Sequence, residues 1–130
     1  MVELAITVCD GHSSFQNNVY VGNHHFEKTV QELEKFRLAV HGGIYDLRLG
    51  SFGPEYGNGA FLARFHFYRG KLYVSTQQES DFFEFTKNKV ASNARLYLRV
   101  EPAALDNFIK GWKTLSRGNS QEAVLDCVSV

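Results

Sequence analysis

Two alternating segments on either side of Arg69-Gly70 constrain the fold more than any other feature. Within residues 60–78, side chains that face a core and side chains that face solvent alternate with the two-residue period of a β-strand. A tight turn at Arg69-Gly70 pairs Tyr68 with Lys71 and fixes the register behind it. One side of the hairpin then carries the pairs Phe67–Leu72, Phe65–Val74 and Ala63–Thr76, and the other carries His66–Tyr73 and Arg64–Ser75. Because both segments agree in register, they predict a long antiparallel hairpin with one buried face.

Further strands are predicted on both sides of this hairpin. The same alternation marks residues 2–9, 18–22, 44–49 and 92–101, and the apolar segment 123–130 fits an edge strand. Phe83 and Phe85 suggest another short strand, joined to 92–101 by the polar residues 87–89. We expect these two rings to point inward, with Glu84 between them facing solvent. The glycine-rich segment 50–59 is expected to be a long hairpin connection.

Two amphipathic helices complete the pattern. The first is expected from about residue 26 to 41, where apolar residues recur at helical spacing before Gly42-Gly43. The second is expected from Pro102 to about residue 117, with an apolar stripe that ends before Gly118. This order of elements predicts an α+β fold, in which both helices pack on one face of a single, mainly antiparallel, twisted β-sheet. The 130 residues are expected to form one domain.

Charge and hydropathy exclude several classes of partner. Fourteen basic residues balance fourteen acidic ones, so the chain lacks the electrostatic footprint of a nucleic-acid-binding protein. No window approaches eighteen apolar residues, and the first eight residues do not resemble a secretory signal. We therefore expect a cytoplasmic protein without a membrane partner. Cys9 and Cys127 have no metal-binding spacing and are expected to be buried, reduced thiols.

No motif of a catalytic centre, a metal site or a cofactor site is found. The sequence lacks the nucleophile elbow of hydrolases, and the segment 50–59 lacks the lysine of a phosphate-binding loop. His12 and the adjacent His24 and His25 could come close to Asp10, but neighbouring residues on a strand point to opposite faces. We therefore expect no catalytic residues, no metal and no cofactor, and interpret the histidines as surface residues.

One face of the predicted sheet is a candidate surface for binding a protein partner. If the helices cover one face, the other exposes Arg48, Arg64, His66, Tyr73, Arg95, Tyr97 and Arg99. Arginine and tyrosine are enriched at protein–protein interfaces, and an acidic partner surface is their natural complement. Phe52 and Tyr56 in the loop 50–59 are additional candidates. The plainer interpretation of the face is a solvated surface with cross-strand charge pairs.

An alternative function uses the loop 50–59 itself. A pocket beside this loop would make the protein a small-ligand-binding protein or a small enzyme. His66 or Glu84 would then supply the polar group, since a carboxylate among phenylalanines can have the raised pKa of a general acid.

The layout of residues 1–117 also resembles a known family. An early strand pair precedes a helix with Phe26-x3-Val30-x2-Leu33-x2-Phe36, and the strand-rich middle ends in Leu96-x-Leu98-x-Val100-x4-Leu105-x2-Phe108-x3-Trp112. This layout resembles small bacterial immunity proteins of the WapI type, which are linked to contact-dependent toxins. The resemblance implies binding and neutralisation of a toxin domain in the cytoplasm of the producing cell. It supplies no catalytic residues, and the segment 50–59 lies outside its pattern.

Overall fold

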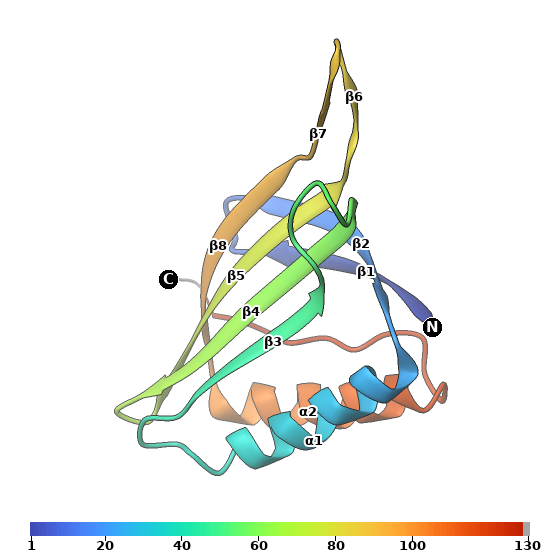
Figure 1. Ribbon diagram of the computed structural model, residues 1–130. Helices are drawn as coiled ribbons and strands as arrows, with labels where there is room; N and C mark the ends of the chain where they lie inside the picture. The colour runs from blue at the N-terminus through green and yellow to red at the C-terminus, as the bar shows by residue number, and fades with distance from the viewer. Residues whose placement is uncertain (129–130) are drawn as a thin grey trace.

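The hairpin at Arg69-Gly70 forms the centre of the largest sheet in a computed structural model that describes residues 1–128. β4 (Asn58–Tyr68) and β5 (Lys71–Asp81) pair in the predicted register, with Tyr68 opposite Lys71. Arg69 and Gly70 both have positive φ angles, 52° and 77°, which suit a two-residue turn between twisted strands. β3 (Ile44–Gly50) and β8 (Asn93–Val100) add to the outer edges, giving the antiparallel order β3-β4-β5-β8 (Figure 1).

A separate two-stranded ribbon of β1 (Val2–Cys9) and β2 (Ser14–Val21) packs against this sheet. Buried side-chain amides join the two parts. Asn17 Nδ2 donates to the carbonyl oxygens of Ala60 and Glu79 at 3.2 and 2.9 Å, and Gln78 Nε2 donates to Asn17 Oδ1 at 2.9 Å. The predicted α+β class with mainly antiparallel strands is confirmed, and the strands are divided among several hydrogen-bonded sheets.

Helices α1 (Asn23–Phe36) and α2 (Pro102–Ser116) lie side by side on the same face of the large sheet (Figure 1). The rings of Phe26 and Trp112 join them, with centroids 4.4 Å apart. The second helix agrees with its prediction, whereas the first ends at Phe36 instead of near residue 41. The apolar spacing continues to Val40, but tight backbone turns replace the helix after Arg37. No helix within residues 1–128 is long and apolar enough to cross a bilayer.

Strands β6 (Phe83–Phe85) and β7 (Asn88–Val90) form a hairpin that projects beyond the large sheet (Figure 1). We call residues 82–91 the finger. The expectation that Phe83 and Phe85 point inward is wrong, because their side chains are 46% and 63% exposed. Their strand extends past the helices, so no core lies beneath it.

The segment after α2 returns along the molecule in an extended conformation. It reaches β8, where the Val128 amide donates to the Arg99 carbonyl at 2.9 Å. Within residues 123–128 this bridge is the only strand-like pairing, and residues 129–130 of the predicted edge strand lie outside the described residues. The prediction of buried thiols is also wrong, since Cys9 and Cys127 are both exposed. Cys9 occupies a position of β1 that alternates away from the core residues Leu4 and Val8.

Candidate functional site

Seven of the nine residues predicted to bind a partner lie together on the face of the large sheet that the helices leave open. We call this the outer sheet face. The strand register arranges it in three rows, Ile44–His66–Tyr73–Arg99, Asp46–Arg64–Ser75–Tyr97 and Arg48–Leu62–Gln77–Arg95. Neighbouring strands lie about 4.8 Å apart, so side chains in one row are within reach of one another. The structure therefore brings these residues into one surface, as the strand pattern indicated.

The basic charge of this surface is partly neutralised at Asp46. This carboxylate accepts two hydrogen bonds from Arg64 and lies 3.4 Å from Arg48 Nη2. The guanidinium of Arg64 holds the pKa of Asp46 below its ordinary value, and Asp46 in turn raises the pKa of Arg64. The plainer interpretation, a face with cross-strand charge pairs, therefore describes the β3–β4 side of the outer sheet face.

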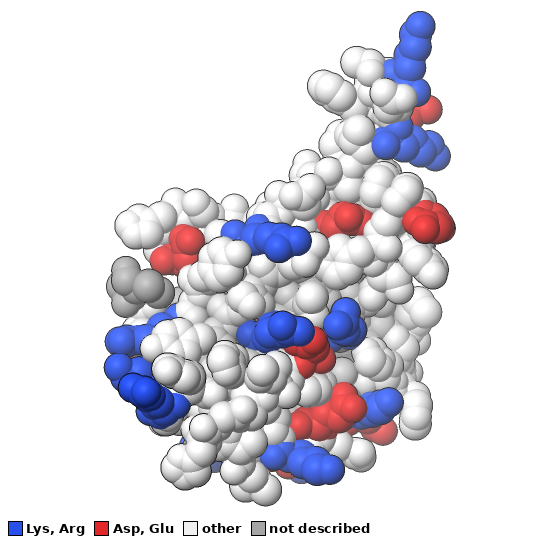
Figure 2. Space-filling model, turned by 60° about the vertical axis from the view of Figure 1, so that its left-hand side comes forward, with Lys and Arg blue, Asp and Glu red and all other residues white. Residues whose placement is uncertain are grey.

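The β8 side of the same face differs in its electrostatics. Within residues 1–128, neither Arg95 nor Arg99 has a carboxylate within 4.0 Å. Tyr97 lies between them and is 65% exposed, and Tyr73 beside Arg99 is 41% exposed. Arginines without an ion pair, interleaved with exposed rings, remain available for contacts with another molecule. Figure 2 shows basic side chains spread over the face in view with acidic ones among them, so recognition of charge on this face is local.

A shallow depression of about 240 Å³ lies across the middle of the outer sheet face. It is lined by Leu62, Arg64, Ser75, Thr76, Gln77, Arg95 and Tyr97. The apolar side chain of Leu62 interrupts an otherwise polar row, which leaves a hollow among longer side chains. A protruding side chain of a partner could enter this hollow and contact arginines from both β4 and β8.

Phe52 and Tyr56, the two remaining predicted residues, lie in the connection between β3 and β4 and outside the three rows. This connection is held at the end of the sheet, because the Gly53 amide donates to Glu79 Oε1 at 2.9 Å and the Phe82 amide donates to the Gly57 carbonyl at 3.0 Å. Phe52 is half-buried, whereas the ring of Tyr56 is 60% exposed. The connection therefore carries one exposed aromatic side chain near the base of the finger.

The alternative function places a ligand pocket beside this loop, with His66 or Glu84 as its polar group. A depression of about 440 Å³ is present there, lined by Met1, Tyr20, Gly50, Ser51, Tyr56, Asn58 and Gly59. His66 lies near the opposite end of the outer sheet face, and Glu84 lies on the finger opposite Lys89. Neither His66 nor Glu84 is among the residues that line this depression.

Asp10, His12 and His25 take part in structural hydrogen bonds. The Asp10 carboxylate accepts hydrogen bonds from the amides of His12 and Ser13 in the β1–β2 turn, which lowers the pKa of Asp10. His25 Nε2 lies 2.8 Å from the Arg48 carbonyl oxygen, so its ring joins α1 to β3. Among residues 1–128, no three His, Cys, Asp or Glu side chains are grouped closely enough to hold a metal ion.

The finger is the surface feature that sequence reasoning missed. It exposes Phe83 and Phe85 together with Lys87 and Lys89, and Figure 2 shows basic side chains around its end. The available signal was the length of the segment between β5 and β8, which exceeds what a tight turn needs. The alternation within Phe83-Glu84-Phe85 predicts the strand correctly, but not the exposure of its two rings.

The chain matches no family model, no curated protein and no solved structure. A functional assignment therefore depends on the surface and the cavities described here.

Proposed function

We propose that the protein is a non-catalytic protein-binding module, and more specifically an immunity protein that neutralises a bacterial toxin domain in the cytoplasm. The observation that carries the proposal is the β8 side of the outer sheet face. Arg95, Tyr97 and Arg99 alternate outward from one strand, with Tyr73 opposite Arg99. Arg95 and Tyr97 are exposed, and Arg99 is half-buried.

The chemistry of this surface favours a protein partner. Tyrosine supplies a large, rigid contact area, and arginine donates to several acceptors in a fixed geometry. Both kinds of side chain project from β8, whose backbone is paired along its length with β5, and this pairing limits the entropy lost on binding. An acidic partner surface complements Arg95 and Arg99, and the Asp46 pair marks the border of this basic region.

The finer assignment, to toxin neutralisation, draws on the resemblance of residues 1–117 to immunity proteins of the WapI type. A module of this kind needs tight binding and no chemistry of its own. The absence of a recognisable catalytic motif in the sequence agrees with that requirement.

A binding titration tests the proposal directly. The purified chain is titrated by calorimetry with the toxin domain encoded beside its gene, and we expect submicromolar affinity. The double variant Arg95→Ala, Tyr97→Ala removes a guanidinium and a ring from β8 and is expected to weaken binding by at least about 100-fold. Arg117→Ala, an exposed arginine beyond α2, serves as the charge-matched control and is expected to leave the affinity unchanged.

Two results contradict different parts of the proposal. Undiminished affinity of the double variant excludes the β8 side as the binding surface. Absence of binding between the unaltered chain and the toxin domain excludes toxin neutralisation, whatever the variants do.

A further inference from the structure

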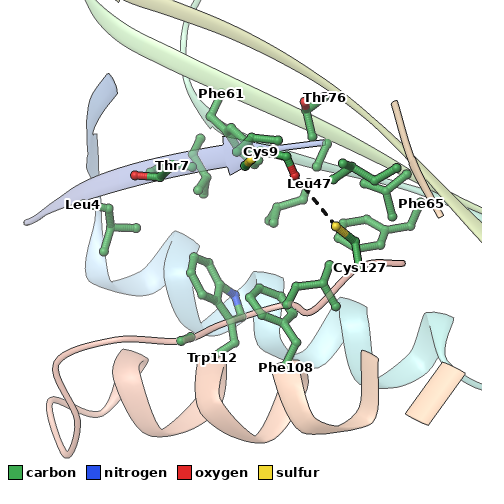
Figure 3. Close-up of a pocket in the computed structure, with 18 of the residues that line it drawn as sticks. Leu4, Thr7, Cys9, Leu47, Phe61, Phe65, Thr76, Phe108, Trp112 and Cys127 are labelled. Atoms are coloured by element: carbon green, nitrogen blue, oxygen red, sulfur yellow. Dashed lines mark hydrogen bonds between the residues drawn. The ribbon is translucent and has the colours of Figure 1, made fainter. Parts of the chain in front are cut away.

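A cavity of about 210 Å³ lies between β1, the inner face of the large sheet, α2 and the segment after it (Figure 3). Four aromatic side chains line it, those of Phe61 and Phe65 from β4 and of Phe108 and Trp112 from α2. Leu47 reaches into it from β3, and Cys9 and Cys127 border it on one side. The cavity is separate from the outer sheet face and from the depression beside the loop 50–59.

The volume of the cavity indicates what size of ligand it can admit. Protein interiors are packed as densely as organic crystals, and voids larger than a water molecule are few. An apolar cavity of about 150 Å³ remains dry and admits benzene. A cavity of about 210 Å³ has room for a somewhat larger ring system.

The chemistry of the lining selects for a neutral ligand. None of the lining residues carries a charge, and the polar side chains among them are those of Thr7, Thr76, Cys9, Cys127 and Trp112. The indole N–H of Trp112 already donates to Thr29 Oγ1 at 3.0 Å. Desolvating a carboxylate or ammonium group here would gain no ion pair in return. The rings of Phe108 and Trp112, which stack with centroids 5.5 Å apart, give the lining an aromatic surface that a planar molecule can contact.

The cavity also reaches the surface along one edge of β1. Among the described residues β1 pairs only with β2, so its other edge faces the cavity and the returning segment 123–127. The lining residues Ala5, Thr7, Cys9 and Cys127 are exposed. The hydrogen bond between this segment and β1 is weak, because Cys127 Sγ lies 3.7 Å from the Cys9 carbonyl oxygen. A ligand can therefore enter by displacing a short stretch of extended chain.

We propose that this cavity is a binding site for a neutral, planar aromatic molecule of about two fused rings, whose size follows from the cavity volume. The site does not depend on the proposed protein-binding function. It would give the protein a second ligand, which is bound inside the fold instead of on the sheet surface.

Two probes that share a naphthalene ring, one neutral and one anionic, test the proposal. The full chain, labelled with ¹⁵N, is titrated with 2-naphthol and separately with 2-naphthoate, up to about 1 mM each. The chain has one tryptophan, so Trp112 gives a single indole N–H signal that reports on the cavity. We expect 2-naphthol to shift this signal saturably and to raise the melting temperature, and 2-naphthoate to bind at least about tenfold more weakly.

Variants that fill the cavity locate the binding. Ala63→Leu and Leu98→Phe each add side-chain volume to the lining, and each is expected to reduce the affinity for 2-naphthol at least about tenfold. Ala103→Leu adds the same volume as Ala63→Leu at an exposed position of α2 and is expected to leave the affinity unchanged. Using two filling variants keeps the test valid if one of them fails to fold.

Three results would overturn the proposal. The first is an unchanged Trp112 signal and melting temperature at the highest 2-naphthol concentration. The second is equal affinity for the neutral and the anionic probe, which contradicts the proposed ligand class. The third is full affinity in a folded cavity-filling variant, which places the binding elsewhere.

Discussion

Asp46 on β3 and Arg64 on β4 lie directly opposite each other and form a two-pronged ion pair on the outer sheet face. Arg64 Nε donates to Asp46 Oδ1 at 2.8 Å, and Arg64 Nη2 donates to Asp46 Oδ2 at 3.0 Å. Two parallel hydrogen bonds hold a guanidinium in a fixed orientation. The pair therefore cancels the charge of one predicted recognition residue and leaves the unpaired arginines on β8 as the basic part of the face.

The first prediction concerns the acid titration of Asp46. Arg64 lowers the folded-state pKa of this carboxyl. The pair therefore stabilises the fold at pH values above the ordinary aspartate pKa of about 3.9. This stabilisation is lost as the pH falls through the lowered pKa of the folded state. Arg64→Gln removes the guanidinium, so we expect the pKa of Asp46 to rise. Titration of its carboxyl carbon signal by NMR measures the change. Arg99→Gln is the control, and a shift of equal size in that variant contradicts the pairing.

The second prediction concerns the buried amides that join the β1–β2 ribbon to the large sheet. Asn17→Ala removes both donors to the carbonyls of Ala60 and Glu79 and one acceptor of Gln78. Because these groups remain buried without partners, we expect the free energy of unfolding to fall by about 2–3 kcal/mol, measured by urea denaturation. The neighbouring Asn18→Ala changes an exposed side chain and is expected to stay within about 0.5 kcal/mol of the unaltered chain. Equal effects of the two variants would show that the amides do not join the parts.

The third prediction concerns Gly59 on β4, which lies against the Asn18 carbonyl group of β2. Its φ angle is +88°, and a Cβ atom there would lie 2.1 Å from the Asn18 carbonyl oxygen. Gly59→Ala therefore forces the backbones apart and strains the residue, and we expect a loss of at least about 2 kcal/mol in unfolding free energy. Gly42→Ala is the matched control, since no atom lies within 4 Å of its Cβ position and its φ is not positive. A Gly59→Ala variant as stable as Gly42→Ala would contradict this close approach.

Local alternation was sufficient to predict the centre of the fold. The register from Tyr68–Lys71 to Ala63–Thr76, and the direction of every side chain in it, follow from a two-residue turn and a two-residue period. The outer sheet face was predictable for the same reason. Once the strands pair in order, the side chains of Arg64, Tyr73 and Tyr97 can only lie on one surface.

The parts that sequence reasoning missed depend on contacts between distant segments. Asn17 appears as an ordinary polar strand residue, and its burial arises only because it meets carbonyl groups more than forty residues away. Asp46 was not predicted as a partner of Arg64, although the strand pairing allows it. The alternation of side chains could not predict the environment of Phe83 and Phe85. Alternation shows that the two faces of a strand differ, but it does not show whether a core packs against either face.

The fourth prediction concerns the finger. Phe85 is 63% exposed and Phe65 is 2% exposed. The same substitution at these two phenylalanines therefore compares an exposed ring with a buried one. We expect Phe65→Ala to cost about 3–5 kcal/mol in unfolding free energy and Phe85→Ala less than about 0.5 kcal/mol. Replacing residues 83–90 by Asn-Gly, which closes the hairpin with a two-residue turn, is likewise expected to leave the stability unchanged. A large loss in the shortened variant would show that the finger packs on the rest of the chain.

The fifth prediction concerns the two thiols. Cys9 and Cys127 are both exposed, and neither forms a disulfide. A maleimide reagent is therefore expected to label two thiols per chain in the native state, at rates close to those in urea, because no unfolding step has to precede the reaction. Mass spectrometry over a time course gives the stoichiometry and the rates, and Cys9→Ser and Cys127→Ser assign them. Cys127 lies on the extended segment that borders the cavity, and Cys9 lies on a paired strand of the ribbon. If either thiol reacts only after urea is added, that segment is covered in the native protein.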